Sequence, residues 1–196
     1  MFKCQLVTAL FFGLSTMFTP LQADDVTDSI QEATEAYAKG DNAKAIESLN
    51  TAVQLIQQAK AKNLEQLLPQ AVSGWTAGQA ESTAVGAAMF GGGITVEKRY
   101  TKGDSVISIQ IVTDSPMLQG MMALFSNPMF ATSSGGKLEK IAGQKVISTY
   151  DASSQSGEYQ IAVANKYMIT LKGEKVSAEE MNAYAEGIDF KKMEME

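Results

Sequence analysis

A stretch of alternating side chains over residues 94–113 constrains the fold more than any other part of the sequence. Two sets of apolar residues recur at every second position: Ile94, Val96 and Tyr100, then Ile107, Ile109 and Ile111. Side chains change face at each residue of a β-strand, so this pattern predicts a half-buried antiparallel pair. Gly103, between the two runs, supplies the positive φ that a hairpin turn needs. An isolated hairpin is only marginally stable, so we expect further strands or a covering helix from the rest of the chain.

The first 23 residues have the pattern of a secretory signal. Lys3 precedes an apolar run at 6–18, and Leu21-Gln22-Ala23 is a plausible cleavage site. The alternative, an uncleaved anchor helix, is disfavoured because the run is shorter than the roughly 20 residues of a membrane span. We therefore expect cleavage after Ala23 and a soluble protein that is periplasmic or secreted and not transmembrane after cleavage.

The side-chain inventory excludes several kinds of chemistry. The 196 residues include no histidine, and the single cysteine, Cys4, lies within the predicted signal. A mature chain of this kind has no Ser-His-Asp or Cys-His catalysis and no zinc site built on imidazole or thiolate. The formal charge is −6 without a basic cluster, which argues against nucleic acid as a partner. We expect no enzyme activity, no cofactor and no metal site; Ser134 and Lys137 have the spacing of a Ser-Lys dyad, without its companion motifs.

Residues 24–68 are predicted to form a helical hairpin. Helical spacing relates Val26, Ile30, Ala33 and Tyr37 in the first helix, and Ile46, Leu49, Val53 and Ile56 in the second. Gly40 separates the helices, and Asp41 is placed to cap the second one. The second helix should reach about Lys62, or further toward Leu68. Pro69 ends the region, which sets the domain boundaries at 1–23, 24–68 and 69–196.

The turn of this hairpin carries a family resemblance. The run from Ala36 to Ile46, followed by Ala52-Val53, resembles one tetratricopeptide helix pair over about residues 33–66. Gly40 falls at the turn of such a unit, and Ala52 at the small position where its helices cross. The resemblance implies contact with another protein. One unit cannot bury its own apolar face, so the pair either packs on the following domain or serves as a docking arm.

A methionine-rich segment follows the first strands. A short helix beginning near Pro116 and the irregular stretch after it contain six candidate partner- or ligand-binding residues: Met117, Met121, Met122, Phe125, Met129 and Phe130. Methionine fills irregular cores and adaptable surfaces, and it is also a thioether ligand for Cu(I). The segment is therefore interpreted as core, as a partner surface or as the wall of an apolar ligand site.

The remaining elements complete an α+β domain. Residues 70–79 look turn-rich, and the glycine-rich stretch at 82–93 is interpreted as a strand with a flexible joint. Further strands are expected near 138–141, 144–150, 159–164 and 167–171. Ser177 and Glu180 form a capping box for a last helix, followed by a frayed charged end. The predicted fold is an N-terminal helical hairpin followed by a mostly antiparallel five- or six-stranded sheet with helices packed on one face.

The order of these elements and the sequence Ile141-Ala142-Gly143 make residues 75–190 similar to small exported α+β domains of the PsbP-like kind. That resemblance implies an accessory or binding role. The functional hypothesis is an exported non-catalytic interaction protein of the bacterial cell envelope that binds a protein partner through the hairpin face or the methionine-rich segment. The alternatives are a periplasmic carrier of a small apolar ligand, then Cu(I) handling through methionines, then an unusual hydrolase.

Overall fold

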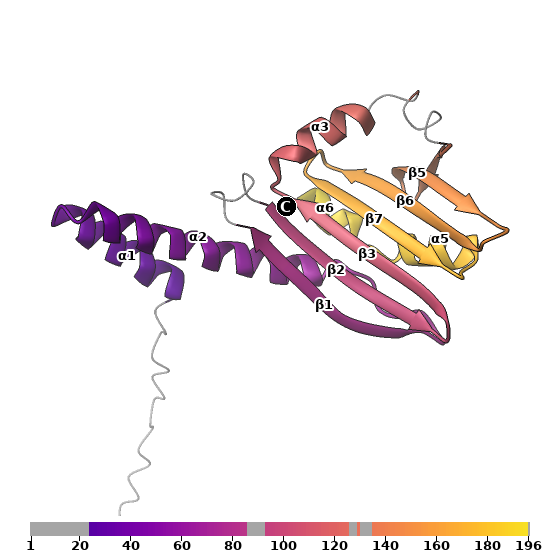
Figure 1. Ribbon diagram of the computed structural model, residues 1–196, viewed down its shortest axis with the longest axis horizontal. Coiled ribbons are helices and arrows are strands. Elements are labelled where there is room, and N and C mark those ends of the chain that lie inside the picture. Colours follow the sequence, from indigo (N-terminus) through magenta and orange to yellow (C-terminus); the bar gives the residue numbers. More distant parts are fainter. Residues whose placement is uncertain (1–23, 86–92, 126–128, 130–134, 196) are drawn as a thin grey trace, which may run out of the picture.

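The computed structural model describes residues 24–85, 93–125, 129 and 135–195 as a helical arm joined to a sheet domain (Figure 1). The helices are α1 (Asp25–Ala38), α2 (Asn42–Glu65), α3 (Pro116–Phe125), α5 (Ala178–Glu186) and α6 (Phe190–Met195). The strands are β1 (Thr76–Val85), β2 (Gly93–Lys102), β3 (Ser105–Thr113), β4 (Lys137–Ile141), β5 (Gln144–Asp151), β6 (Ser156–Val163) and β7 (Tyr167–Glu174). The predicted signal at 1–23, the glycine-rich joint at 86–92, Phe130 and Ser134 lie outside the described residues.

All seven strands belong to one antiparallel sheet with the order β1-β2-β3-β7-β6-β5-β4. Two meanders, β1 to β3 and β4 to β7, meet where β3 pairs with β7. The predicted α+β class is confirmed, with seven strands instead of five or six. The count was low because the outer strands have weak patterns: β1 is rich in alanine, glycine and polar residues, and four of the five residues of β4 are exposed.

The two predicted hairpins form the centre of the sheet. Val96 is level with Ile111 in the β2–β3 pair, and Ile161 is level with Ile169 in the β6–β7 pair. Gly103 has φ 58° at the first turn, as its position predicts. Because this register places the apolar residues of both hairpins on one face, joining β3 to β7 produces a single continuous apolar surface.

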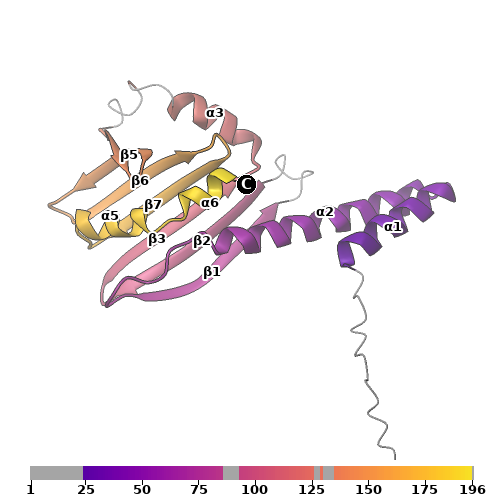
Figure 2. The same cartoon turned by 180° about the vertical axis from the view of Figure 1, so that it is seen from behind.

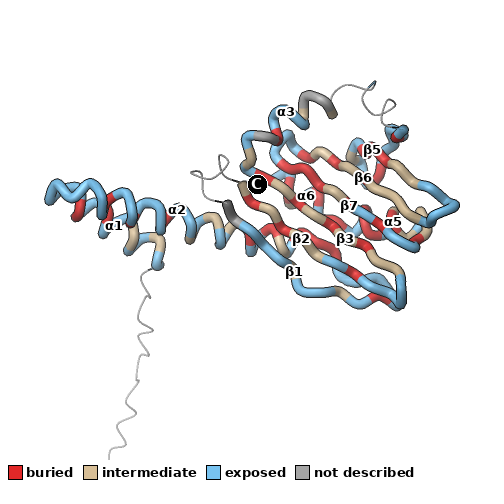
Figure 3. The backbone as a smooth tube through the Cα atoms, viewed as in Figure 1, coloured by how far each residue is buried: buried red, intermediate tan, exposed pale blue. Residues whose placement is uncertain are grey.

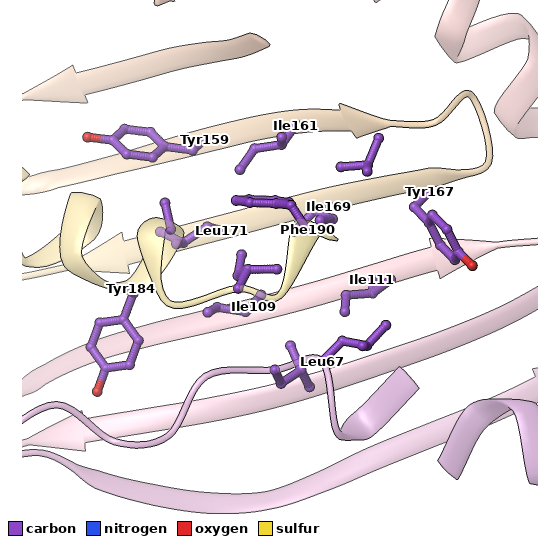
Figure 4. Close-up of a cluster of buried hydrophobic side chains, with 14 of the residues drawn as sticks. Leu67, Ile109, Ile111, Tyr159, Ile161, Tyr167, Ile169, Leu171, Tyr184 and Phe190 are labelled. Atoms are coloured by element: carbon purple, nitrogen blue, oxygen red, sulfur yellow. The ribbon is translucent and has the colours of Figure 1, made fainter. Parts of the chain in front are cut away.

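Helices α5 and α6 and the C-terminal end of α2 cover that surface (Figure 2). Figure 4 shows Phe190 among the isoleucine and leucine side chains of β3 and β7, with Leu67 beside them. Ile109, Ile169 and Leu171 are completely buried. Burying an aliphatic side chain of this size contributes about 1.5–3 kcal/mol, so this face supplies the main stabilisation of the domain.

The segment between α2 and β1 is fixed to the same face. The Tyr100 hydroxyl donates a hydrogen bond of 2.7 Å to the Pro69 carbonyl, and the Asp189 amide donates one of 3.1 Å to the Leu67 carbonyl. Burial raises the pKa of the Tyr100 hydroxyl. Lys98 is half-buried, and its Nζ lies 3.4 Å from the Pro69 oxygen.

Two other predictions are wrong. Strand β1 begins at Thr76, within the stretch that looked turn-rich, and its pairing with β2 compensates for a weak local pattern. The charged C-terminus forms helix α6 instead of fraying, because Phe190 and Met193 are three residues apart and both reach the core. Lys191 and Glu194 occupy the solvent side of that helix, which is why the sequence there looked polar.

Helix α3 lies next to the turn between β6 and β7. Leu118 of this helix is buried, and a hollow of about 410 Å³ separates Pro116 and Gln119 from Asn165 and Lys166. Within the described residues, none of the helices combines the length and the hydropathy that a membrane crossing requires.

Candidate protein-binding surface

Small residues hold the two helices of the arm together. Where α1 and α2 meet, the buried residues are Ala33 and Ala36 of α1 and Ala45, Ser48 and Ala52 of α2, each at most 5% exposed. Side chains of this size let two helix backbones approach closely. The contact between the helices therefore uses almost none of the large apolar side chains of the arm.

The large apolar side chains of the arm point into solvent. Six of them, which we call the arm face, are 45–73% exposed: Ile30, Tyr37, Ile46, Leu49, Val53 and Ile56. Figure 3 shows the arm mainly in the colour of exposed residues, whereas buried residues run through the strands of the sheet. The predicted amphipathic stripe of the second helix exists, but in the outer arm it covers no part of the sheet domain.

A groove of about 700 Å³ runs along the arm between α1 and α2. Its lining consists of Ile30, Ala33, Thr34, Tyr37, Asn42, Ala45, Ile46 and Leu49. The two alanines are buried at the floor, and the larger side chains stand at the walls. A small floor between large walls accepts a row of protruding side chains, which is the way one helix packs against others.

The acidic residues of α1 lie away from the arm face. Asp25, Asp28, Glu32 and Glu35 recur at intervals of three and four along α1, so they share the side turned away from Ile30. The Glu32 carboxylate forms an ion pair of 2.9 Å with Lys44 and accepts a hydrogen bond from the Ser48 hydroxyl. The Lys44 hydrogen bond, more than the bond from Ser48, lowers the pKa of the Glu32 carboxyl. In α2, positions 50–59 contain no charged residue.

The methionine-rich segment also exposes apolar side chains. Met121 is 41% exposed and Met129 76% exposed, whereas Met122 and Phe125 are half-buried. The Met117 side chain and Phe130 lie outside the described residues. Of the four predicted binding residues whose side chains are described, Met121 and Met129 are exposed, and the hollow beside α3 contains none of the four in its lining.

Asp24 and Glu180, each next to a second carboxylate in the sequence, have structural roles at helix starts. Asp24 accepts a hydrogen bond from the Val26 amide at the start of α1. Glu180 completes the capping box of α5 with Ser177 and also pairs with Lys102. The hydrogen bond from Lys102 is the main reason that the pKa of the Glu180 carboxyl is lowered. These contacts keep the carboxylate ionised, which is the opposite of what a general acid needs.

The sequence identified the residues of the arm face and left open whether they are exposed. Apolar spacing assigned Ile30 and Ile46 to stripes, and such stripes usually face a core. The signal that was overlooked is a row of small residues beside the large apolar ones. The row consists of Ala33 and Ala36 in α1, and of Ala45, Ser48 and Ala52 in α2. Searches against protein-family models, curated proteins and solved structures give no match to this chain. The tetratricopeptide-like and PsbP-like resemblances therefore stay predictions.

Proposed function

We propose that this chain is an exported, non-catalytic accessory protein of the bacterial cell envelope that binds a protein partner through the arm face. The signal-like pattern of residues 1–23 supports export to the periplasm or beyond. The absence of histidine and of a cysteine after Cys4 supports a binding role over a catalytic one. The observation that carries the proposal is the exposure of six large apolar side chains on one face of a projecting arm.

Covering this face contributes a favourable free energy to binding. Full burial of an aliphatic side chain contributes about 1.5–3 kcal/mol, so covering a half-exposed one contributes roughly 1 kcal/mol. Contiguous exposed apolar surface of this kind is typical of interaction sites. The sheet domain already has its own core, which leaves the arm face free for a partner.

The shape of the apolar groove favours a protein over a small ligand. The groove lies open along the outside of the arm, between Ile30 and Leu49. A carrier of a small apolar molecule needs a concave site that surrounds most of the ligand. An open groove with alanine at its floor is better suited to a row of side chains from another helix.

The test is co-purification of the full chain from the envelope fraction of its own host, followed by native mass spectrometry. We expect a bound protein with the wild type and with Thr51→Glu, an exposed control away from the arm face. Ile46→Glu should lose that protein while its melting temperature matches that of the unbound wild type. The proposal fails if Ile46→Glu retains every bound protein, or if it retains an adduct of a few hundred daltons as the sole bound species.

A further inference from the structure

We infer that the partner seated on the arm face is a second copy of this chain, paired about a twofold axis that crosses α2 between Leu49 and Val53. This inference rests on the proposed function, since it names the occupant of the same surface. The resulting contact is a bundle of four helices, two from each copy. Three properties of the arm support it: the order of shapes along the face, the spacing of the side chains and the position of the charges.

The arm face has a groove in its outer half and a ridge in its inner half. The groove lies between Ile46 and Leu49 on one side and α1 on the other. Glu32 contacts both Lys44 and Ser48, so the antiparallel α1 begins level with about Val53. Val53 and Ile56 are half-exposed where α1 no longer flanks α2, and they form the ridge. One molecule therefore carries both a groove and the row of side chains that fits it.

A twofold axis brings these two shapes together. The groove centre and the ridge centre are seven residues apart on α2, which is about 10 Å along a helix. An antiparallel second arm, placed so that its Val53 is level with Leu49 of the first, sets each ridge into the other groove. Such reciprocal use of one surface is the requirement for an isologous dimer. The 3-4-3 spacing from Ile46 to Ile56 is also the spacing by which helices pack at about 20° in bundles.

The charges of the arm permit this pairing. In the proposed register, Lys44 is level with Gln58, Glu47 with Leu55 and Lys60 with Asn42. None of these pairs opposes two like charges, and positions 50–59 add none. The carboxylates of α1 lie on the far side of the arm. Two acidic chains can thus meet along a contact in which none of these α2 charges opposes a like charge, and the central strip at 50–59 is uncharged.

Cysteine cross-linking of the full chain tests the register directly. In a Cys4→Ser background the introduced cysteine is the sole thiol. We expect an equal mixture of Leu49→Cys and Val53→Cys to oxidise mainly to the mixed covalent dimer, because these positions are level across the axis. Each variant alone should cross-link at least about tenfold more slowly, since its two cysteines lie beyond disulfide distance. Thr51→Cys, on the opposite side of α2, is the control and should remain uncross-linked.

Sedimentation equilibrium provides the matching measurement without thiols. Wild type and Thr51→Glu should be dimers, and Ile46→Glu should weaken self-association by at least roughly 100-fold, because it buries an unpaired carboxylate. Cross-links mainly between like cysteines, or a monomeric wild type, overturn the inference. If the wild type is monomeric and Ile46→Glu still loses another envelope protein, this inference fails and the proposed function stands. If Ile46→Glu changes no association at all, both fail.

Discussion

The sheet and the arm both carry apolar stripes, but the two regions place them on opposite sides. In the sheet, Ile109 and Ile169 face the covering helices and are completely buried. In the arm, the alanines meet and residues such as Ile46 point outward. Apolar spacing therefore identifies one face of a helix but not what that face contacts. In the arm, α1 and α2 contact each other through the small residues that lie beside the large apolar ones.

The largest expected effect compares one isoleucine from each region. Ile109→Ala leaves a cavity in a fully packed core and should lower the free energy of unfolding by about 2–5 kcal/mol. Ile46→Ala removes an exposed side chain from a helix and should change it by less than about 1 kcal/mol. Urea denaturation at a concentration where the chain is monomeric measures both. Equal losses in the two variants would mean that the arm face is covered within a single chain.

An intermediate effect follows from two buried tyrosines of the sheet domain, one in β6 and one in α5. Burial raises the pKa of Tyr159 to about 12, and it also raises the pKa of Tyr184. The unfolded chain ionises its tyrosines near pH 10, before the folded chain does, so stability is full below about pH 10 and is lost as the pH rises toward 12. Urea midpoints measured from pH 8 to pH 12 should fall more steeply for the wild type than for Tyr159→Phe.

The arm supplies the control for this pH dependence. Tyr37→Phe removes a hydroxyl from a side chain that is 73% exposed. Its urea midpoints should follow those of the wild type across the same range. Parallel curves for the wild type and Tyr159→Phe would contradict the assignment of alkaline instability to the buried hydroxyl, which donates a hydrogen bond of 2.9 Å to Asn182.

The smallest effect concerns the link between the two regions. Lys60 of α2 and Asp114, at the junction of β3 and α3, form an ion pair of 2.5 Å with both side chains at least 40% exposed. Asp114→Asn removes the charge, and asparagine tolerates the φ of 56° at this position. The loss should be below about 1 kcal/mol in thermal unfolding and should shrink at high salt. A loss as large as that of Ile109→Ala would show that the ion pair fixes the arm to the sheet.

Much of the sheet could be predicted because its signals are local. The alternation from Ile94 to Ile111, the turn at Gly103 and the capping box at Ser177 each depend on a few neighbouring residues. The beginning of strand β1 and the whole of helix α6 were missed because their formation depends on distant partners. Thr76 pairs with Thr101, and Met193 is buried by the sheet, so neither contact is visible in the local sequence.

The candidate site was only partly predictable for the same reason. The sequence marked Leu49 and Val53 as one stripe, which the structure confirms as a common face. Whether that stripe meets the sheet domain depends on where α2 joins it, and this is set by the burial of Ala61 and Leu64 at the far end of the helix. The methionine-rich segment was predicted as a binding surface from its composition. Composition does not show which of its side chains face the sheet.

The continuity of α2 has a mechanical consequence. The helix runs for 24 residues, from the arm into the core, without a proline or a glycine. A helix of this length is about 36 Å long and has no built-in hinge. Anything bound at the tip is therefore held at a set distance and angle from the sheet, and a torque applied there is transmitted to the Leu64 end of the core. A molecule bound to the arm would thus lie at a fixed separation from the surfaces of the sheet domain.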